Sequence, residues 1–365
     1  MKAVILVGGL GTRLRPLSIN TPKSMMPVVN IPFIEYVIRR LSRHNIRQIV
    51  LAISHLAQPI KNYLGDGSQF GANIFYTVEE TALGTAGAVK NAEQYLDNEA
   101  FVVLNGDIFT DLDISAMTTL HNRRKAKITI ALTPVEDPTH YGLIETDDKD
   151  RVTRFLEKPS REQVTTDMIN AGTYIMEADV LNSIPAQTMF SFEHKVFPPL
   201  LQEGEPIYAF PSSCYWMDIG TSQKYHQLNR DLLNGKSDQF SFNTNSQVSI
   251  GENSNVHQSA EITGPVVIGN GCTIGQKVKL NGPIVVGHGS TIGDGAIVED
   301  SVIWHNVEIE PGAMVKRSII ANNCHIGAAS TIVDTVISDN VTIAAGYNLK
   351  SGSKIWPDTK VVQDL

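Results

Sequence analysis

The N-terminal stretch of the chain reads Ala3-Val4-Ile5-Leu6-Val7-Gly8-Gly9-Leu10-Gly11-Thr12-Arg13-Leu14, and Thr21-Pro22-Lys23 follows soon after. The apolar run predicts a buried parallel strand, because strands covered on both faces are continuously hydrophobic. The glycines let the backbone turn sharply and approach a ligand, so that N–H groups can bind phosphate oxygens. Arg13 and Lys23 supply positive charge. This stretch predicts a nucleotide site at the first strand-to-helix turn of an α/β sheet.

Two familiar glycine motifs do not fit this turn. The dinucleotide fingerprint needs a third glycine where the chain has Leu14. The P-loop needs Gly-Lys-Ser/Thr, but Lys23-Ser24 follows a proline. On these residues alone, a surface turn with solvated charges is also possible, since glycine-rich turns are common.

The composition is that of a globular protein, with 42% hydrophobic and 19% charged residues. A length of 365 residues predicts two or three domains of roughly 100–200 residues each. The net charge of −8 argues against a nucleic-acid partner. Three widely spaced cysteines, Cys214, Cys272 and Cys324, favour a reducing compartment, and we expect a cytoplasmic protein. No apolar run approaches the roughly 18 residues of a membrane span, so we expect no membrane partner.

Residues 1–235 alternate between apolar runs and helical spacing, which predicts an α/β sheet flanked by helices. The predicted strands are Ala3–Val7, Gln48–Ile53, Asn73–Thr77, Phe101–Asn105 and Lys127–Leu132. The predicted helices are Pro32–His44, Gln58–Leu64, Gly84–Tyr95, Ile114–Arg124 and Thr221–Asn234. Residues 236–246 are polar and lack either period, which is typical of a linker.

Residues 247–365 carry a six-residue repeat, which predicts a parallel β-helix with one short strand and turn per repeat. The recurring aliphatic residues, expected to point inward, are Ile250, Val256, Ile262, Ile268, Ile274, Leu280, Val286, Ile292, Val298, Ile303, Ile309, Val315, Ile320, Ile326, Ile332, Ile337, Ile343, Leu349, Ile355 and Val361. The phase slips by one residue three times, first between Val298 and Ile303. Each slip predicts a coil of 17 residues in place of 18, with the change absorbed at a corner.

Two aspartates are candidate ligand-binding residues: one follows a predicted apolar strand, and the other precedes a predicted helix. Asp107 ends the run Phe101–Asp107, and Asp218 stands before Gly220 and Thr221. Ligands bind beyond the carboxyl ends of strands in open α/β sheets, and one or two carboxylates suit Mg²⁺. Each aspartate could instead be a turn or capping residue. Thr221 is the better N-cap for the following helix, which leaves Asp218 for another role.

The sequence as a whole resembles the sugar nucleotidyltransferase (NDP-sugar pyrophosphorylase) family. Gly8–Leu14 with Pro22-Lys23 is similar to that family's signature loop, although Ser24 stands where the family usually has proline. The resemblance implies a Rossmann-like mixed sheet followed by a left-handed β-helix. It also implies the reaction of an NTP with a sugar-1-phosphate, which gives an NDP-sugar and pyrophosphate.

The resemblance assigns roles to residues of this sequence. It implies phosphate contacts from the catalytic cations Arg13, Lys23 and Lys158, and Mg²⁺ held by Asp107 and Asp218. The residues implied on the nucleotide side are Gly8, Gly9, Gly11, Thr12, Glu80, Gly84 and Thr85. Those implied on the sugar side are Tyr141, Gly142, Glu157, Asn170 and Gly172.

The sequence does not decide which nucleobase and which sugar the two substrates carry. Guanine presents N–H donors that call for an acceptor, and Glu79 or Glu80 could serve. The segment Leu83–Gly87 resembles the guanylyltransferase branch, which makes GTP and mannose-1-phosphate the first expectation. Glucose-1-phosphate with another NTP (giving ADP-, UDP- or dTDP-glucose) is the alternative.

Two other classes compete with this function. Hexapeptide repeats also occur in acyltransferases, whose histidine base would have to be one of His257, His288, His305 and His325. A non-catalytic regulatory subunit is the third class, but the charged residues of the proposed site are all present. The end coils of a β-helix favour subunit packing, so we expect a homo-oligomer.

Overall fold

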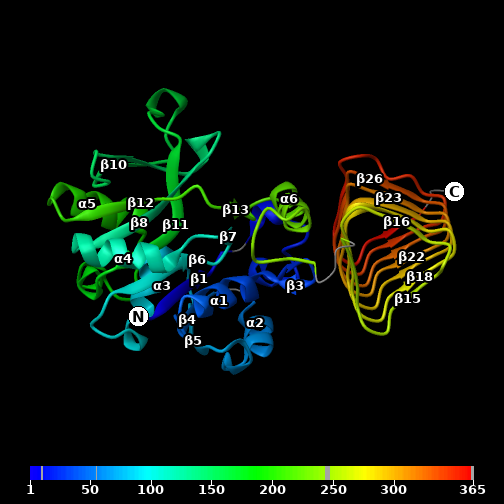
Figure 1. The fold of residues 1–365 in the computed structure, drawn as a ribbon, viewed down its shortest axis with the longest axis horizontal. Coiled ribbons are helices and arrows are strands. Elements are labelled where there is room, and N and C mark those ends of the chain that lie inside the picture. Colours follow the sequence, from blue (N-terminus) through cyan, green and yellow to red (C-terminus); the bar gives the residue numbers. More distant parts are fainter. Residues whose placement is uncertain (10, 55, 243–246, 363–365) are drawn as a thin grey trace. The chain divides into compact units, whose positions relative to one another are not determined.

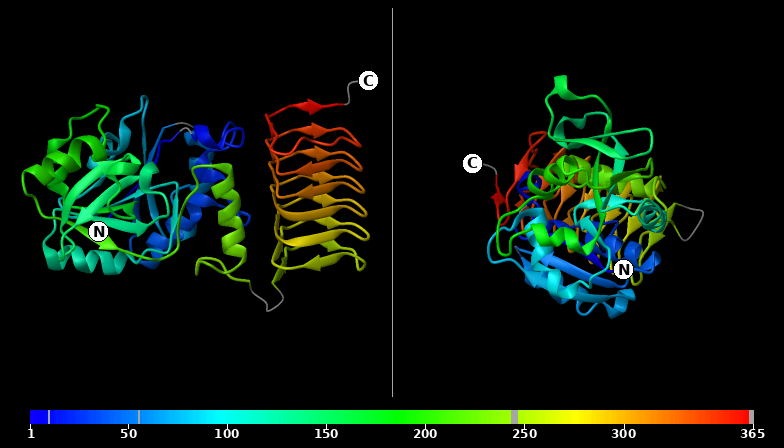
Figure 2. Two further views of the ribbon diagram at one scale, coloured as in Figure 1. Left: turned by 90° about the horizontal axis from the view of Figure 1, so that it is seen from above. Right: turned by 90° about the vertical axis from the view of Figure 1, so that its left-hand side faces the viewer.

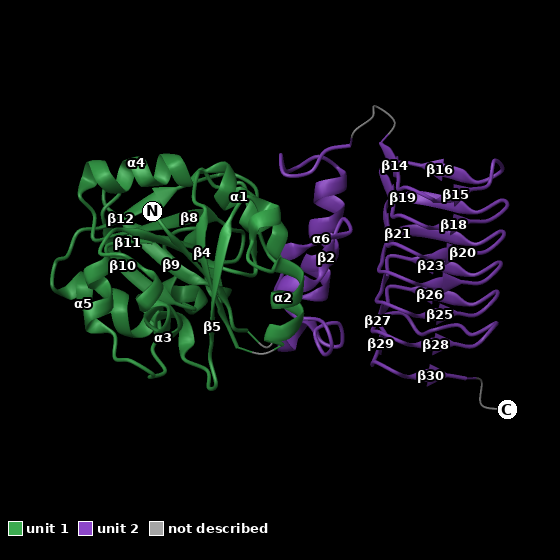
Figure 3. Ribbon diagram, turned by 90° about the horizontal axis from the view of Figure 1, so that it is seen from below, with its two compact units in different colours: residues 1–9, 34–218 green, residues 10–33, 219–365 purple. Residues whose placement is uncertain are grey.

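The computed structural model describes residues 1–9, 11–54, 56–242 and 247–362, which form two compact units. The first unit comprises residues 1–9 and 34–218, and the second comprises residues 10–33 and 219–365 (Figure 3). The segment after Gly9 therefore groups with the C-terminal repeat rather than with its neighbours in sequence. The domain boundaries at 235 and 246 stay a prediction, and residues 243–246 of the predicted linker lie outside the described residues.

A mixed sheet forms the centre of the first unit (Figure 1). Its strands run in the order β10-β9-β11-β6-β1-β4-β5, with β8 beside β11 and β12 beside β8. The strands are β1 (Ala3–Val7), β4 (Gln48–Ile53), β5 (Asn73–Val78), β6 (Phe101–Asn105), β8 (Ile128–Pro134), β9 (Gly142–Thr146), β10 (Val152–Glu157), β11 (Met168–Met176) and β12 (Ile207–Pro211). A separate two-stranded ladder joins β7 (Ile108–Thr110) to β13 (Trp216–Asp218).

Helices flank this sheet, as the alternating pattern predicts (Figure 2). They are α1 (Phe33–Arg43), α2 (Ala57–Leu64), α3 (Gly84–Asn91), α4 (Ile114–Arg124) and α5 (Phe197–Gln202). The predicted helix from Gly84 to Tyr95 is wrong at its end, because α3 stops at Asn91 and a separate 3-10 turn covers Glu93–Tyr95. Such tight turns are common where a helix ends. No helix in the described part of the chain is long and apolar enough to cross a membrane.

Strand β1 occupies the centre of the sheet, parallel to both β4 and β6. Ala3, Val4 and Ile5 have no exposed surface. Continuous apolar sequence is therefore required here, because both faces of the strand are covered. The predicted buried strand is confirmed, and its carboxyl end leads directly into Gly8.

The second unit contains a short hairpin, one helix and the repeat region. The hairpin pairs β2 (Pro27–Val28) with β3 (Ile31–Pro32), and the helix is α6 (Ser222–Leu233). Thr221 caps α6, because its side-chain oxygen accepts a hydrogen bond from the Lys224 N–H at 3.3 Å. The predicted cap is confirmed, so Asp218 is not the residue that caps this helix.

The repeat region forms parallel sheets of the kind found in a left-handed β-helix, as the sequence predicts (Figure 1). Its strands are β14 (Val248–Ile250), β15 (Asn255–Val256), β16 (Glu261–Thr263), β17 (Val266–Ile268), β18 (Thr273–Ile274), β19 (Lys279–Val286), β20 (Thr291–Ile292), β21 (Ile297–Ile303), β22 (Glu308–Ile309), β23 (Met314–Lys316), β24 (Ile319–Ile320), β25 (His325–Ile326), β26 (Thr331–Val333), β27 (Val336–Ile337), β28 (Thr342–Ile343), β29 (Lys354–Ile355) and β30 (Lys360–Val361). The repeating aliphatic side chains fill the interior of the middle coils. Ile250 is 50% exposed because, among the described residues, a neighbouring coil pairs with it on one side only.

Where the sequence repeat slips by one residue, the structure has a coil of 17 residues. Ile268 pairs with Val286, 18 positions later, whereas Val286 pairs with Ile303, only 17 positions later. The shortened corners contain Asp300, Arg317 and Asp334, each with a positive φ. Gly264, at the same corner of an 18-residue coil, also has a positive φ, so a left-handed residue at this corner is common to both coil lengths.

Candidate active site

The first two glycines of the N-terminal loop continue from β1 in the first unit. The Ser54 hydroxyl donates a 2.5 Å hydrogen bond to the Gly8 carbonyl. A Cβ at Gly8 would lie 3.8 Å from Oε1 of Glu79, so this carboxylate faces the glycine. Oε2 of Glu79 accepts the Leu83 N–H at 3.1 Å, and burial raises the pKa of Glu79. Glu79 therefore lies beside the glycine turn.

The remaining loop residues, including both predicted phosphate-binding cations, belong to the second unit. Gly11 has φ +59, and its carbonyl accepts a 2.7 Å hydrogen bond from the Ser18 hydroxyl. A Cβ at Gly11 would lie 3.2 Å from Ser18 and 3.7 Å from Cβ of Lys23. Thr12 and Arg13 begin a short 3-10 turn and are exposed. The structure thus brings Gly11 and Lys23 together.

The two predicted metal-binding aspartates lie at or next to the ladder of β7 and β13. Asp218 pairs with Ile108, the residue after Asp107, so the register brings the backbone of the two aspartates close together. The Tyr141 hydroxyl donates a 2.9 Å hydrogen bond to Oδ1 of Asp218. Its ring also packs edge-on against Trp216, with centroids 5.6 Å apart. These contacts fix Asp218 beside a predicted sugar-side residue.

Gly142 and Glu157 face each other across the β9–β10 ladder. A Cβ at Gly142 would lie 3.0 Å from Oε2 of Glu157 and 2.7 Å from the Phe155 ring. The next residue, Lys158, has φ +47, and its N–H donates to the Tyr141 carbonyl at 2.9 Å. Its side chain is 69% exposed, with the ammonium 3.9 Å from Glu157. The structure therefore joins four predicted residues in one cluster.

Asn170 and Gly172 form a second part of this cluster on β11. Nδ2 of Asn170 donates to the Tyr174 hydroxyl at 2.7 Å, and Oδ1 accepts the Gly172 N–H at 2.9 Å. Gly172 has φ +69. A Cβ there would lie 2.3 Å from the Ile108 side chain and 2.6 Å from that of Asn105. Only glycine fits this position.

Sequence reasoning missed Glu193, which lies in the π-helical turn Phe192–Val196. Its carboxylate accepts a 2.9 Å hydrogen bond from the Thr85 hydroxyl. Burial raises the pKa of Glu157, and the charge of Glu193 raises it further. Burial likewise raises the pKa of Tyr174, with Glu193, Glu157 and Asp107 contributing. Nothing in the local sequence singles out Glu193, because its partners come from distant segments.

The start of α3 is fixed by the loop before Glu193. Gly84 has φ +70, and a Cβ there would lie 2.7 Å from the Phe190 carbonyl oxygen. The Thr85 hydroxyl also accepts the Phe192 N–H at 3.0 Å. Glu80, just before α3, is exposed. Thr85 thus has a structural role that the nucleotide-side prediction did not include.

The four histidines of the repeat have hydrogen-bond partners. His288 and His305 stack with ring centroids 5.0 Å apart, and Nδ1 of each accepts a backbone N–H of an adjacent coil. His257 contacts a serine hydroxyl, and His325 contacts a glutamate carboxylate. These contacts give the histidines structural roles at the corners of the β-helix.

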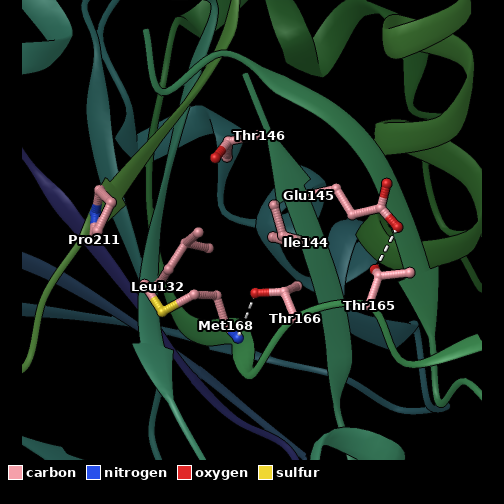
Figure 4. A pocket seen from close by; sticks show the side chains of 8 residues that line it. All are labelled: Leu132, Ile144, Glu145, Thr146, Thr165, Thr166, Met168 and Pro211. Carbon is pink, nitrogen blue, oxygen red and sulfur yellow. Dashed lines mark hydrogen bonds between the residues drawn. The ribbon is translucent and has the colours of Figure 1, made fainter. Parts of the chain in front are cut away.

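A cavity of about 450 Å³ opens beside β9 and β11 (Figure 4). Its wall includes Glu145, which accepts a 2.6 Å hydrogen bond from the Thr165 hydroxyl. The lining residues are Leu132, Ile144, Glu145, Thr146, Thr165, Thr166, Met168 and Pro211. No residue predicted for the site is among them, so this cavity is separate from the cluster around Glu157.

Comparisons with known proteins give the family of the chain. A model of the nucleotidyl transferase family matches residues 2–235. The chain therefore belongs to this family of enzymes. A model of the GMPPB C-terminal domain matches residues 262–365, which contain most of the β-helix.

The relatives differ in the nucleotide that their names state. Over 234 residues, the chain is 39% identical to mannose-1-phosphate guanylyltransferase of Mycobacterium tuberculosis, covering 64% of this chain and 65% of that protein. It is 37% identical over 246 residues to UTP–glucose-1-phosphate uridylyltransferase of Synechocystis sp., covering 64% and 63%. Both matches span less than two thirds of the relative's own length. The solved structure of HddC from Yersinia pseudotuberculosis complexed with GMP-PN is 29% identical, with a TM-score of 0.54, covering 62% of this chain and 97% of that chain.

Proposed function

We propose that this chain transfers a nucleoside monophosphate from an NTP to a sugar-1-phosphate and releases pyrophosphate. The preferred pair is GTP and mannose-1-phosphate, which gives GDP-mannose. A glucose-1-phosphate nucleotidyltransferase that makes ADP-, UDP- or dTDP-glucose is the alternative. The named relatives include both a mannose-1-phosphate and a glucose-1-phosphate enzyme, which supports the class of reaction more strongly than the choice of sugar.

The observation that carries this proposal is the cluster around Glu157. Carboxylate and amide groups from four segments gather beside two glycines, Gly142 and Gly172, that leave no room for side chains. Hydroxyl-rich ligands are bound by such acceptors and donors, and the glycines let the surrounding side chains pack close to the backbone. We assign Glu157 and Asn170 to the sugar hydroxyls, with Tyr141 holding Asp218 in place.

The proposed reaction needs no protein nucleophile. A phosphate oxygen of the sugar-1-phosphate attacks the α-phosphorus, and the bond from that phosphorus to the β-phosphate oxygen breaks. Catalysis then consists of positioning two anions and neutralising their charge. We assign the departing β- and γ-phosphates to Arg13, the α-phosphate to Lys23 and the incoming phosphate to Lys158.

Asp107 and Asp218 fit a magnesium ion. They provide hard oxygen donors from Asp218 in the β7–β13 ladder and from Asp107, the residue before its first strand. Among the residues that the structure describes, no group of three or more His, Cys, Asp or Glu side chains could hold a metal. Mg²⁺ is usually held by one or two carboxylates, and substrate phosphates and water complete its coordination. When bound, the ion would offset negative charge on the phosphates.

We assign recognition of the base to Glu79 rather than Glu80. The carboxylate of Glu79 is half-buried beside Gly8, whereas Glu80 is exposed. A carboxylate can accept both N1–H and N2–H₂ of guanine, which supports GTP as the nucleotide. The proposed partners are therefore GTP and mannose-1-phosphate, with no nucleic acid, in a cytoplasmic homo-oligomer.

Alanine substitution of Lys23 or Asp107 tests the assigned roles. Each variant should lower turnover by about 10²–10³, the scale for losing a preorganised charge stabiliser. Pyrophosphate release measures the effect. Lys149→Ala is the matched control, because Lys149 is an exposed lysine on the turn between β9 and β10 and has no assigned role. Near-normal turnover in both site variants would contradict the assignment.

A further inference from the structure

A chain of buried hydrogen bonds links the β-helix to the segment that carries Arg13 and Lys23. The indole N–H of Trp304, in the β-helix, donates to the Tyr225 hydroxyl at 2.8 Å. That hydroxyl in turn donates to the carbonyl of Pro27, only four residues after Lys23. Trp304 and Tyr225 have no exposed surface. The contact is therefore shielded from water along its whole length.

The hairpin after Lys23 is held at two further points. Val29 has φ +47, a conformation that β-branched residues rarely adopt. Its N–H donates at 2.9 Å to Oδ1 of the fully buried Asn229 in α6. The Asn30 side chain donates at 2.9 Å to the Val286 carbonyl in the β-helix. Contacts from α6 and the β-helix thus hold the turn in a shape that its own sequence disfavours.

The start of the same segment is also attached to the β-helix. The buried hydroxyl of Ser338 donates a 3.0 Å hydrogen bond to the Pro16 carbonyl, three residues after Arg13. Burial raises the pKa of the neighbouring Asp339, and the side chain of Asn20 is among the groups that lower it. The β-helix is therefore linked to the segment between Arg13 and Lys23, at Pro16, and again after Lys23, at Pro27.

We propose that the β-helix is a positioning scaffold for Arg13 and Lys23, and that Trp304, Tyr225 and Ser338 are positioning residues for the transfer reaction. The proposal rests on the proposed function for its kinetic consequences. The described residues 11–32 contain only 3-10 turns and a two-residue-strand hairpin, so they need outside support to keep one shape. A stack of β-coils is a stiff support, because every coil pairs with its neighbours. Loss of one buried contact leaves a polar partner unsatisfied and releases the segment.

The test compares Trp304→Phe with Trp356→Phe. Both changes replace an indole by a phenyl ring in the β-helix, but Trp356 is 53% exposed. We expect Trp304→Phe to lower kcat about tenfold and to raise KM for the NTP, with KM for the sugar-1-phosphate unchanged. Trp356→Phe should match the parent. A simple loss of folded enzyme would lower kcat and leave both KM values unchanged, so that result would overturn the proposal.

Serine variants provide a second pair in case Trp304→Phe does not fold. Ser338→Ala removes the bond to Pro16, whereas Ser330→Ala removes a buried hydroxyl that has no hydrogen-bond partner among the described residues. Hydrogen exchange of the full-length parent and variants should show faster exchange of backbone amides in residues 10–33 for Ser338→Ala only. Unchanged exchange in Ser338→Ala would overturn the proposal. If the parent releases no pyrophosphate with any substrate pair, the proposed function fails, and the exchange result alone decides whether the β-helix holds the segment.

Discussion

Gly172 lets β11 pack closely against the side chains that flank Asp107. Its φ of +69 is one that L side chains rarely adopt, and a Cβ would lie 2.3 Å from the Ile108 side chain. Gly172→Ala should therefore destabilise the fold by about 3 kcal/mol, from left-handed strain and overpacking together. Gly204→Ala is the matched control, because Gly204 has φ +75 but open space around it, and should cost about 1 kcal/mol. Urea unfolding measures both; equal effects would show that the clash is absent.

At the residue scale, the sequence predicts the parts of the site that depend on local backbone. Gly142 and Gly172 are predicted on the sugar side, and the structure adds that packing requires glycine at both, because a Cβ would clash with neighbouring side chains. Glu193 could not be found this way, because its position depends on a hydrogen bond to Thr85, more than a hundred residues away in the chain. The choice between Glu79 and Glu80 also depends on burial, which adjacent residues in a sequence do not reveal.

At the element scale, a ladder of side-chain acceptors runs along one corner of the β-helix. Nδ1 of His288 and of His305 each accept an N–H, and Oδ1 of Asn322 does the same for the His305 N–H at 3.2 Å. Burial lowers the pKa of His305, and the neighbouring His288 lowers it further. Since an imidazolium cannot accept at Nδ1, the ladder requires neutral rings.

The ladder predicts that the β-helix loses stability on acidification. With a lowered pKa in the folded state, His305 binds fewer protons when folded than when unfolded, so stability is lost as the pH falls below about 6.5. His305→Asn should keep the acceptor, as Asn322 does, and weaken this pH dependence. Thermal unfolding between pH 7.5 and 5 measures the slope. An unchanged slope in the variant would contradict this account.

The strands of the β-helix follow from the six-residue period, because each inward position stacks on its equivalent one coil away. The period also locates the 17-residue coils. It does not identify the residues at the shortened corners as left-handed, since none of Asp300, Arg317 and Asp334 is a glycine or an asparagine. Backbone geometry at a corner depends on the coils above and below it.

At the scale of the whole molecule, the sequence predicts domains that each consist of one continuous stretch of chain. In the structure, residues 10–33 instead belong to the same compact unit as residues 219–365. That grouping depends on contacts such as Trp304 with Tyr225, which join residues far apart in the sequence. No periodic pattern encodes such a pair.

The exposed coil ends predict self-association. Ile250 in the first coil and Trp356 in the last are each at least half exposed, and apolar surface of this kind favours burial against another subunit. We expect a solution mass of at least two chains by light scattering. Ile250→Glu combined with Trp356→Glu should shift that mass toward one chain, because a buried charge opposes association. A sharp monomer mass for the parent chain would contradict this expectation.

Pyrophosphate release across the four NTPs and several sugar-1-phosphates tests the central claim most directly. The proposed roles of Arg13, Lys23, Asp107 and Glu79 predict release that depends on both substrates, with GTP and mannose-1-phosphate giving the highest kcat/KM. Highest activity with glucose-1-phosphate and another NTP would support the alternative sugar and base. Absence of release with every pair, by folded protein with Mg²⁺ present, would contradict the account.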